Sequence, residues 1–285
     1  MVILIKRLQE LFGYVISGYR ELKYLPFLLG VKDSGKSIIL KLLEYLVGIE
    51  NTTNLSFEQL NKSEYLVELF NKRLNTCGET SEVSLNKLDV FKKITGGDFI
   101  MARQLYNQPI KFVNTAVLVF AGNHLPIIKG QDSYSAFSKR LLIFPFDYSV
   151  PKESQDIQLY DKLIDEIDYI ASWAIKGLKR LIKNNFEFTT NEYIEAILDN
   201  FINNNNSISN FINRCCEINV TKQTHTYELY KAYESFCNIN NYTLESNNQF
   251  CAFLNNLSGL QKTRFRKNDE NKLGYKGIKL IEGEN

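Results

Sequence analysis

The residues with the clearest capacity for chemistry form one short segment, Gly30-Val31-Lys32-Asp33-Ser34-Gly35-Lys36-Ser37. It matches the phosphate-binding pattern G-x-x-x-x-G-K-[ST] in full. Its glycines allow the backbone N–H groups to face phosphate oxygens at the start of a helix. Lys36 is expected to reach the β- and γ-phosphates of a nucleotide, and the Ser37 hydroxyl to ligate Mg²⁺. The residues expected to bind the nucleotide are Gly30, Asp33, Ser34, Gly35, Lys36 and Ser37.

A phosphate-binding loop needs an acid near it to hold Mg²⁺ or to polarise the attacking water. The best candidate is Glu79, which follows the short apolar run 74–77 and lies 42 residues after Ser37. Glu82 is the second choice, and a solvated surface glutamate is the alternative for either residue. We expect Glu79 to be both catalytic and metal-binding.

Two further polar residues flank apolar runs of strand length. Asn123 follows the run 116–121, where its amide can bond to a γ-phosphate and to the attacking water; a simple turn cap is the alternative. Arg140 comes 17 residues later, just before the next apolar run. It is either an arginine finger that reaches the nucleotide of a neighbouring subunit, or a salt-bridge partner at a strand end.

Between Glu79 and Asn123, alternating residues around a polar turn suggest a β-hairpin. Basic side chains with an aromatic one near its tip are suited to phosphate contact and base stacking, although a solvated surface hairpin has the same pattern. The DNA-binding residues expected here are Lys92, Lys93, Arg103, Tyr106 and Lys111.

Apolar runs at 24–29, 74–77, 116–121 and 141–146 lie between helical or polar segments. This is typical of buried parallel strands in an α/β fold, whose ligands bind beyond the carboxyl ends of the strands. Apolar periodicity predicts an opening helix over 3–18 and another from the phosphate-binding segment to about Val47.

The pattern changes after Pro151 to amphipathic helices at 157–182, 193–202 and 208–216, with a polar loop at 203–207. From about Val220, helices at 226–237 and 247–257 precede strand-like runs at 261–266 and 275–281. Two helices followed by a hairpin are typical of the winged-helix class. We expect an α/β ATPase core over 1–150, a helical linker over 151–218 and a winged-helix domain over 219–285.

The final hairpin is rich in basic side chains, which suit a duplex DNA backbone; a charged, soluble hairpin is the alternative. The DNA contacts expected there are Arg264, Arg266 and Lys267. Because the whole chain of 285 residues has a net charge of only +2, any nucleic-acid contact must come from such local placement.

Composition excludes several classes of protein. With 44% hydrophobic and 23% charged residues, the chain has material for a core and is not disordered overall. Five cysteines and two histidines form no zinc-binding spacing, and an odd cysteine count fits reduced thiols. Without a signal peptide or a membrane-spanning run, we expect a cytoplasmic protein with no membrane partner.

In order and spacing, these segments resemble the superfamily 3 helicases, in particular the helicase part of phage and plasmid primase-helicases and the replication initiators of staphylococcal-type mobile islands. The resemblance covers roughly residues 20–148, and the C-terminal ELYKAYESFC and KLGYKGIKLI resemble the winged-helix tail of such proteins. The segments that carry it are GVKDSGKS, LNTCGE, FKKITGGDFIMARQLY, VLVFAGNHLP and SKRLLIFPF.

The resemblance implies an AAA+ core that hydrolyses ATP with Mg²⁺ and unwinds DNA as a hexameric ring during replication of a phage, plasmid or other mobile element. It implies Glu79 as the catalytic acid, Asn123 as the sensor and Arg140 as a finger in trans, with the basic hairpin lining a channel around single-stranded DNA. Duplex DNA, further copies of the chain and a primase or polymerase are the other partners implied.

One departure keeps two other functions open. The family usually has two acids where this chain has Gly78 before Glu79. An ATP-binding origin-recognition protein with weak or no helicase activity is the first alternative. The second is a P-loop NTPase, acting as a switch or a kinase, that does not use nucleic acid.

Overall fold

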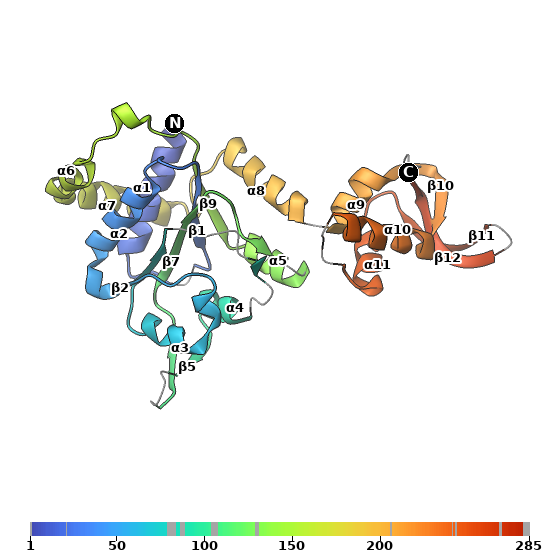
Figure 1. The fold of residues 1–285 in the computed structure, drawn as a ribbon, viewed down its shortest axis with the longest axis horizontal. Helices are drawn as coiled ribbons and strands as arrows, with labels where there is room; N and C mark the ends of the chain where they lie inside the picture. The colour runs from blue at the N-terminus through green and yellow to red at the C-terminus, as the bar shows by residue number, and fades with distance from the viewer. Residues whose placement is uncertain are drawn as a thin grey trace. The chain divides into compact units, whose positions relative to one another are not determined.

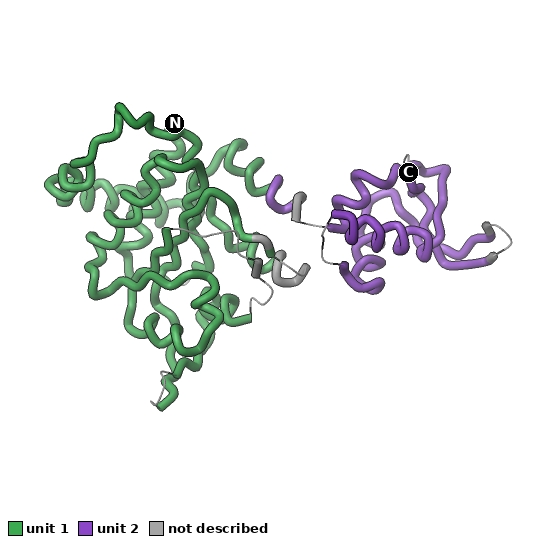
Figure 2. Tube along the Cα trace, viewed as in Figure 1, with its two compact units in different colours: residues 1–199 green, residues 200–285 purple. Residues whose placement is uncertain are grey.

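The chain divides into two compact units, residues 1–199 and 200–285, with the boundary inside helix α8 (Figure 2). The expected boundaries at 150 and 218 differ from this division, since residues 151–199 lie in the first unit. The architecture is that of a computed structural model. It describes residues 2–20, 22–78, 84–85, 89–103, 108–128, 131–205, 207–240, 242, 244–267 and 270–281.

The first unit is built on a five-stranded sheet in the order β2-β3-β7-β1-β9, in which every neighbouring pair is parallel (Figure 1). This confirms the parallel α/β prediction. Since β1 lies between β7 and β9, the strand order reverses at β1, and a ligand site is expected beyond its carboxyl end. The strands are β1 (Leu25–Gly30), β2 (Thr52–Thr53), β3 (Leu74–Cys77), β7 (Val117–Gly122) and β9 (Leu141–Phe146).

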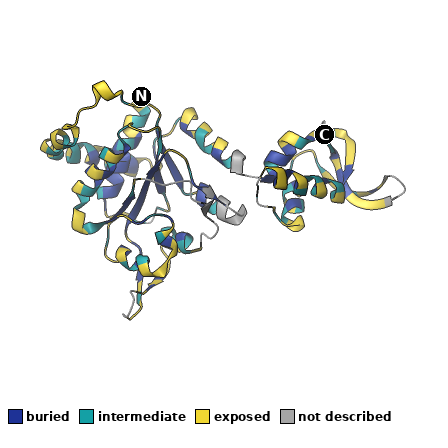
Figure 3. Ribbon diagram, in the orientation of Figure 1, coloured by how far each residue is buried: buried dark blue, intermediate teal, exposed yellow. Residues whose placement is uncertain are grey.

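Helices α1 (Val2–Ile16), α2 (Lys36–Val47) and α7 (Ile167–Lys183) share one hydrophobic core with the sheet. Val119 of β7 lies in this core, which is dark blue in Figure 3. Helices α1 and α7 approach closely because Gly177 has no side chain: a Cβ there would lie 2.1 Å from the Gln9 carbonyl oxygen. The predicted opening helix and the helix after the phosphate-binding segment are therefore confirmed.

An aromatic cluster involves the next residue of β7. Phe120 stacks on Phe57 with ring centroids 3.8 Å apart and an angle of 9° between the rings. Phe57 also contacts Phe91 and Phe137, which belong to α4 (Asp89–Gly96) and α5 (Gln131–Ser138). Alternation of side chains along a strand thus places β7 between two sets of helices.

The remaining elements of the first unit connect these layers. The expected hairpin is present as β5 and β6, an antiparallel pair, but Lys92 and Lys93 precede it on α4. The elements are β5 (Phe99–Ala102), β6 (Ile110–Val113), α3 (Ser63–Leu66), β4 (Ser84–Leu85), β8 (Ile127–Ile128), α6 (Leu159–Asp165), α8 (Glu192–Asn205), and the short 3-10 turns Ile49–Asn51, Gln59–Asn61, Val67–Leu69 and Lys152–Ser154.

The second unit follows the order helix, strand, helix, helix, strand, strand, and its sheet has the order β10-β12-β11 with antiparallel pairs. Its core is formed around Phe211, Tyr233, Phe250 and Tyr275. Both predicted helices and both predicted final strands are confirmed. The elements are α9 (Ser207–Cys215), β10 (Cys216–His225), α10 (Thr226–Ile239), α11 (Asn247–Asn255), β11 (Gln261–Lys267) and β12 (Glu270–Leu280).

In this region one strand was missed from the sequence, and one prediction is wrong. Strand β10 was not predicted, because most of its side chains are polar and exposed and it lacks an apolar run. The loop expected at 203–207 is wrong, since α8 extends to Asn205 and α9 begins at Ser207, with Asn206 outside the described residues. Across the described ranges, no helix combines the length and apolarity that crossing a membrane requires.

Candidate nucleotide and nucleic-acid sites

The phosphate-binding segment connects β1 to α2 at the carboxyl edge of the sheet. Gly35 precedes α2 with φ of 90°, a left-handed conformation that suits glycine because a Cβ disfavours it. The start of α2 has no side-chain cap, so its first N–H groups are open to an anion, as a phosphate site requires. Ser37 is exposed in the first turn of α2, where its hydroxyl is accessible to a metal ion.

Lys36 is buried and its ammonium group is held by oxygen atoms of the segment. Nζ donates to the carbonyl oxygens of Gly30 at 2.8 Å and Val31 at 2.5 Å, and to Ser34 Oγ at 3.2 Å. Burial lowers the pKa of Lys36, and the nearby Asp33 carboxylate partly offsets this effect. A cation held mainly by neutral oxygens retains its full attraction for an incoming phosphate.

Asn123 directly follows β7 and meets Lys36. The distance from Lys36 Nζ to Asn123 Oδ1 is 3.3 Å, although 87 positions separate the two residues. Adjacent parallel strands β1 and β7 explain this contact, because their carboxyl ends lie at the same edge. The structure therefore brings together the lysine and the asparagine that the sequence singled out.

Arg140 lies just before β9 and bonds within its own chain. Its Nε donates to Thr95 Oγ1 at 3.0 Å and its Nη1 to the Ala136 carbonyl oxygen at 2.6 Å. Burial lowers the pKa of Arg140. These bonds connect the arginine to α4, which carries Lys92 and Lys93, and to α5. Within the described part of the chain, Arg140 forms no salt bridge.

The expected metal-binding acid is not among the residues that the structure describes. Neither Glu79 nor Glu82 is among the described residues, and the described residues contain no cluster of three or more His, Cys, Asp or Glu suited to a metal ion. The Ser37 hydroxyl fits a Mg²⁺ ion that takes its other oxygens from phosphates and water.

The β5–β6 hairpin has one exposed face that sequence reasoning missed. Phe99 and Met101 are 62% and 60% exposed, and Lys111 Nζ lies 4.3 Å from the centroid of the Phe99 ring. Ile100 and Phe112 are buried, so the hairpin has one packed face and one open face. Apolar residues occur on both faces of the hairpin, so the sequence alone does not indicate which face is exposed. Arg103 is exposed, and Tyr106 lies outside the described residues.

The other expected DNA contacts belong to the second unit. Arg264 and Arg266 are exposed on β11, whereas the side chain of Lys267 lies outside the description. Facing residues on β11 and β12 form an antiparallel ribbon, with Arg264 opposite Leu273. The expected nucleic-acid residues therefore lie in two places, one in each unit.

Comparisons with known proteins agree with this division. Residues 28–140 match a family of unknown function, DUF5906, and residues 203–281 match the family described as poxvirus D5 protein-like. A protein of the Sputnik virophage named "Putative helicase V13" is 28% identical over 163 residues, which is 53% of this chain and 21% of that protein. The match thus spans about a fifth of the relative's length.

The fold also resembles solved structures. Two apo structures of the NrS-1 C-terminal region align with TM-scores of 0.55 and 0.54, each at 11% identity. The two alignments cover 95% and 97% of this chain, and they cover 73% and 75% of the aligned NrS-1 chains. At this identity the likeness concerns the fold alone, and it extends over nearly the whole sequence. The sequence matches, for their part, make this chain similar to a poxvirus D5-like family and to a putative virophage helicase.

Proposed function

We propose that this chain is an ATP-dependent DNA helicase or replication initiator of a viral, phage or plasmid type. The observation that carries the proposal is the contact between Lys36 Nζ and Asn123 Oδ1 at the carboxyl edge of the sheet. It places a phosphate-binding cation beside an amide that can orient the attacking water. The D5-like match and the virophage relative support DNA unwinding rather than another use of ATP.

In this proposal, hydrolysis of ATP supplies the chemical energy, Mg²⁺ would offset the negative charge of the phosphates, and the residues of the chain bind and orient both. The N–H groups at the start of α2 and Lys36 bind the phosphates, and the Ser37 hydroxyl, with Glu79, holds the metal. Asn123 orients the water whose oxygen attacks the γ-phosphorus, while the bond from that phosphorus to the β–γ bridging oxygen breaks and ADP leaves. Glu79 accepts the proton of that water.

The coupling to DNA is also part of the proposal. The open face of the hairpin, with Phe99 and Lys111, is suited to stacking a base and contacting a phosphate of single-stranded DNA. We propose ring-shaped self-association, most simply a hexamer, in which Arg140 contacts the nucleotide of the neighbouring copy. The Thr95 bond would then connect that arginine to the helix leading into the hairpin.

For the second unit we propose a winged-helix domain that binds DNA. Its order of helices and strands and its three-stranded antiparallel sheet fit that class. The same observation favours the second candidate function, an origin-recognition protein with weak or no helicase activity.

ATP hydrolysis with and without single-stranded DNA tests the proposal. We expect stimulation by DNA, and a loss of at least about 100-fold in Lys36→Ala and Glu79→Gln, equivalent to about 2.7 kcal/mol of transition-state stabilisation. Lys32→Ala is the matched control, because Lys32 is an exposed lysine of the same segment. Hydrolysis indifferent to DNA would favour a P-loop switch, and tight duplex binding without hydrolysis would favour the origin-recognition function.

A further inference from the structure

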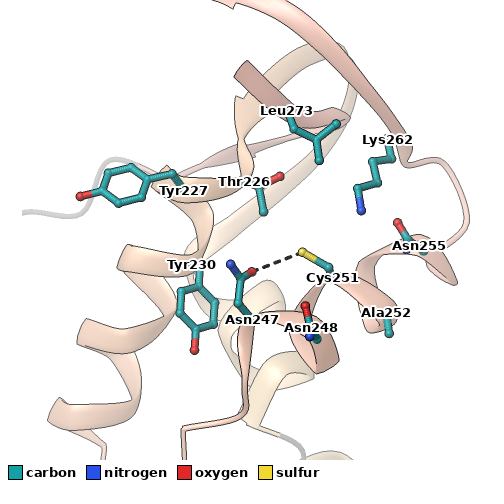
Figure 4. A pocket seen from close by; sticks show the side chains of 10 residues that line it. All are labelled: Thr226, Tyr227, Tyr230, Asn247, Asn248, Cys251, Ala252, Asn255, Lys262 and Leu273. Atoms are coloured by element: carbon teal, nitrogen blue, oxygen red, sulfur yellow. Dashed lines mark hydrogen bonds between the residues drawn. The ribbon is translucent and has the colours of Figure 1, made fainter. Parts of the chain in front are cut away.

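A hollow of about 540 Å³ lies in the second unit, between the start of α10, helix α11 and the β11–β12 ribbon (Figure 4). Its volume is sufficient for a nucleotide unit of a DNA strand. Its described lining residues include Lys262, three asparagines and Thr226, and none of them is acidic. The function described above does not use this hollow.

The outward face of α11 forms one wall because of how the helix is anchored. A capping box between Ser246 and Gln249 fixes its start. Phe250 and Leu254 are fully buried one turn apart, which turns the opposite face of the helix outward. That outward face carries Asn248 and Asn255, and the first residue of the helix, Asn247, completes the three asparagines of the lining.

The polar groups that point into the hollow are mainly hydrogen-bond donors. The Tyr275 hydroxyl donates to Asn255 Oδ1 at 2.9 Å, which leaves the Nδ2 protons of Asn255 for another acceptor. Lys262 extends its ammonium group toward Asn255 in Figure 4. The Thr226 hydroxyl oxygen exposes less than 1 Å² of surface, so it is not accessible to a ligand in the hollow.

A cation beside an amide N–H donor, with no acid among the described lining residues, forms a site for an anion. Within the DNA-binding role proposed above, on which this inference rests, the anion is a phosphodiester. A helix with its side chains is about 10–12 Å wide and fits the major groove of duplex DNA, which is about 12 Å wide. An exposed helix face beside a basic ribbon therefore favours the duplex over the single strand.

We infer that this hollow binds the backbone of duplex DNA, with Lys262 and Asn255 contacting a phosphate while Asn248 contacts a base edge. The different roles of Asn255 and Asn248 follow from the hydrogen bonds that each side chain already forms. Recognition of adenine by asparagine uses both Oδ1 and Nδ2. Asn255 Oδ1 already accepts from Tyr275, whereas exposed Asn248 forms no hydrogen bond with the described residues and keeps both atoms.

Fluorescence anisotropy with a labelled 24-base-pair duplex of mixed sequence, and with its single strand, tests the phosphate contacts in the full chain. We expect Lys262→Gln to weaken duplex binding about tenfold and to lower the salt slope by about one. Asn255→Asp keeps an acceptor for Tyr275 but opposes the phosphate, so it should weaken binding at least as much.

Lys279→Gln is the matched control, because it removes the same charge from the same sheet while Lys279 pairs with Glu217 at 2.8 Å. Duplex binding that falls no further in Lys262→Gln and Asn255→Asp than in this control would overturn the inference. Tighter binding of the single strand than of the duplex by the wild-type chain would overturn the choice of duplex.

Selection from a randomised duplex pool tests the role of Asn248. We expect a base preference in the wild type that Asn248→Ala loses, with affinity for non-preferred sequences unchanged; an unchanged preference would overturn this assignment. The same variants separate the two proposals. If the variants of the hollow keep both DNA-stimulated hydrolysis and duplex binding, the helicase proposal is supported and this binding site is refuted. If the wild-type chain hydrolyses no ATP but these variants lose duplex binding, the binding site is supported and the helicase proposal is refuted.

Discussion

The ammonium group of Lys36 lies 3.3 Å from Oδ1 of Asn123, although 87 positions separate the two residues in the chain. The contact exists because β1 and β7 are neighbours in parallel orientation. It brings the proposed phosphate ligand and the proposed water-orienting amide to one edge of the sheet, and it makes the role of Asn123 directly testable.

Replacing Asn123 by alanine should lower kcat for ATP about 10- to 100-fold while changing the affinity for ATP less than about threefold, because the amide orients the water and Lys36 retains the phosphates. Steady-state hydrolysis and nucleotide titration measure the two effects. His124→Ala, at the exposed neighbouring residue, is the control. A loss confined to ATP affinity would assign Asn123 to phosphate binding instead.

Replacing Thr95 by valine should destabilise the first unit by about 1–3 kcal/mol, because the partly buried Arg140 guanidinium then loses the acceptor of its Nε–H. Thr95→Ser keeps the hydroxyl and should stay within about 0.5 kcal/mol of the wild type. Urea unfolding measures both changes. Equal stabilities for the two variants would mean that the Arg140 bond contributes nothing measurable.

Replacing Gly177 by alanine should lower the free energy of unfolding by about 1–3 kcal/mol. The new Cβ would lie 2.1 Å from the Gln9 carbonyl oxygen and force α1 and α7 apart. Gly18→Ala is the matched control, because no atom lies within 4 Å of a Cβ at that position. We expect that variant to unfold at nearly the wild-type urea concentration, and similar losses in both variants would contradict the close helix contact.

The stability of the second unit should fall as the pH rises above about 9. Burial raises the pKa of the Cys216 thiol from 9.0 to about 12, with a smaller contribution from Cys215. Between these values the folded state keeps the thiol proton and the unfolded state releases it, so alkali favours unfolding. Urea unfolding between pH 8.5 and 10.5 should show a shallower decline in Cys216→Ala than in the wild type. Equal declines of stability with pH in the two proteins would show that the Cys216 thiol is not the main cause of the loss.

Local sequence patterns were sufficient for most elements of the fold. Continuous apolar runs marked β1, β7 and β9, because strands buried on both faces need them. The phosphate-binding loop was evident from the spacing of Gly30, Gly35 and Lys36, because backbone geometry there depends on adjacent residues. Strand β10 escaped because pairing with β12, rather than its own polar side chains, makes it a strand.

The contacts between distant residues were decided only by the tertiary structure. Asn123 was a candidate from its place after an apolar run, but its distance from Lys36 depends on the order of strands in the sheet. No local pattern indicated that Thr95 would accept a hydrogen bond from Arg140, or that Asn255 Oδ1 would accept one from the Tyr275 hydroxyl beside a hollow. Periodicity reports which face of an element is buried, whereas packing of the whole chain determines which residues meet there.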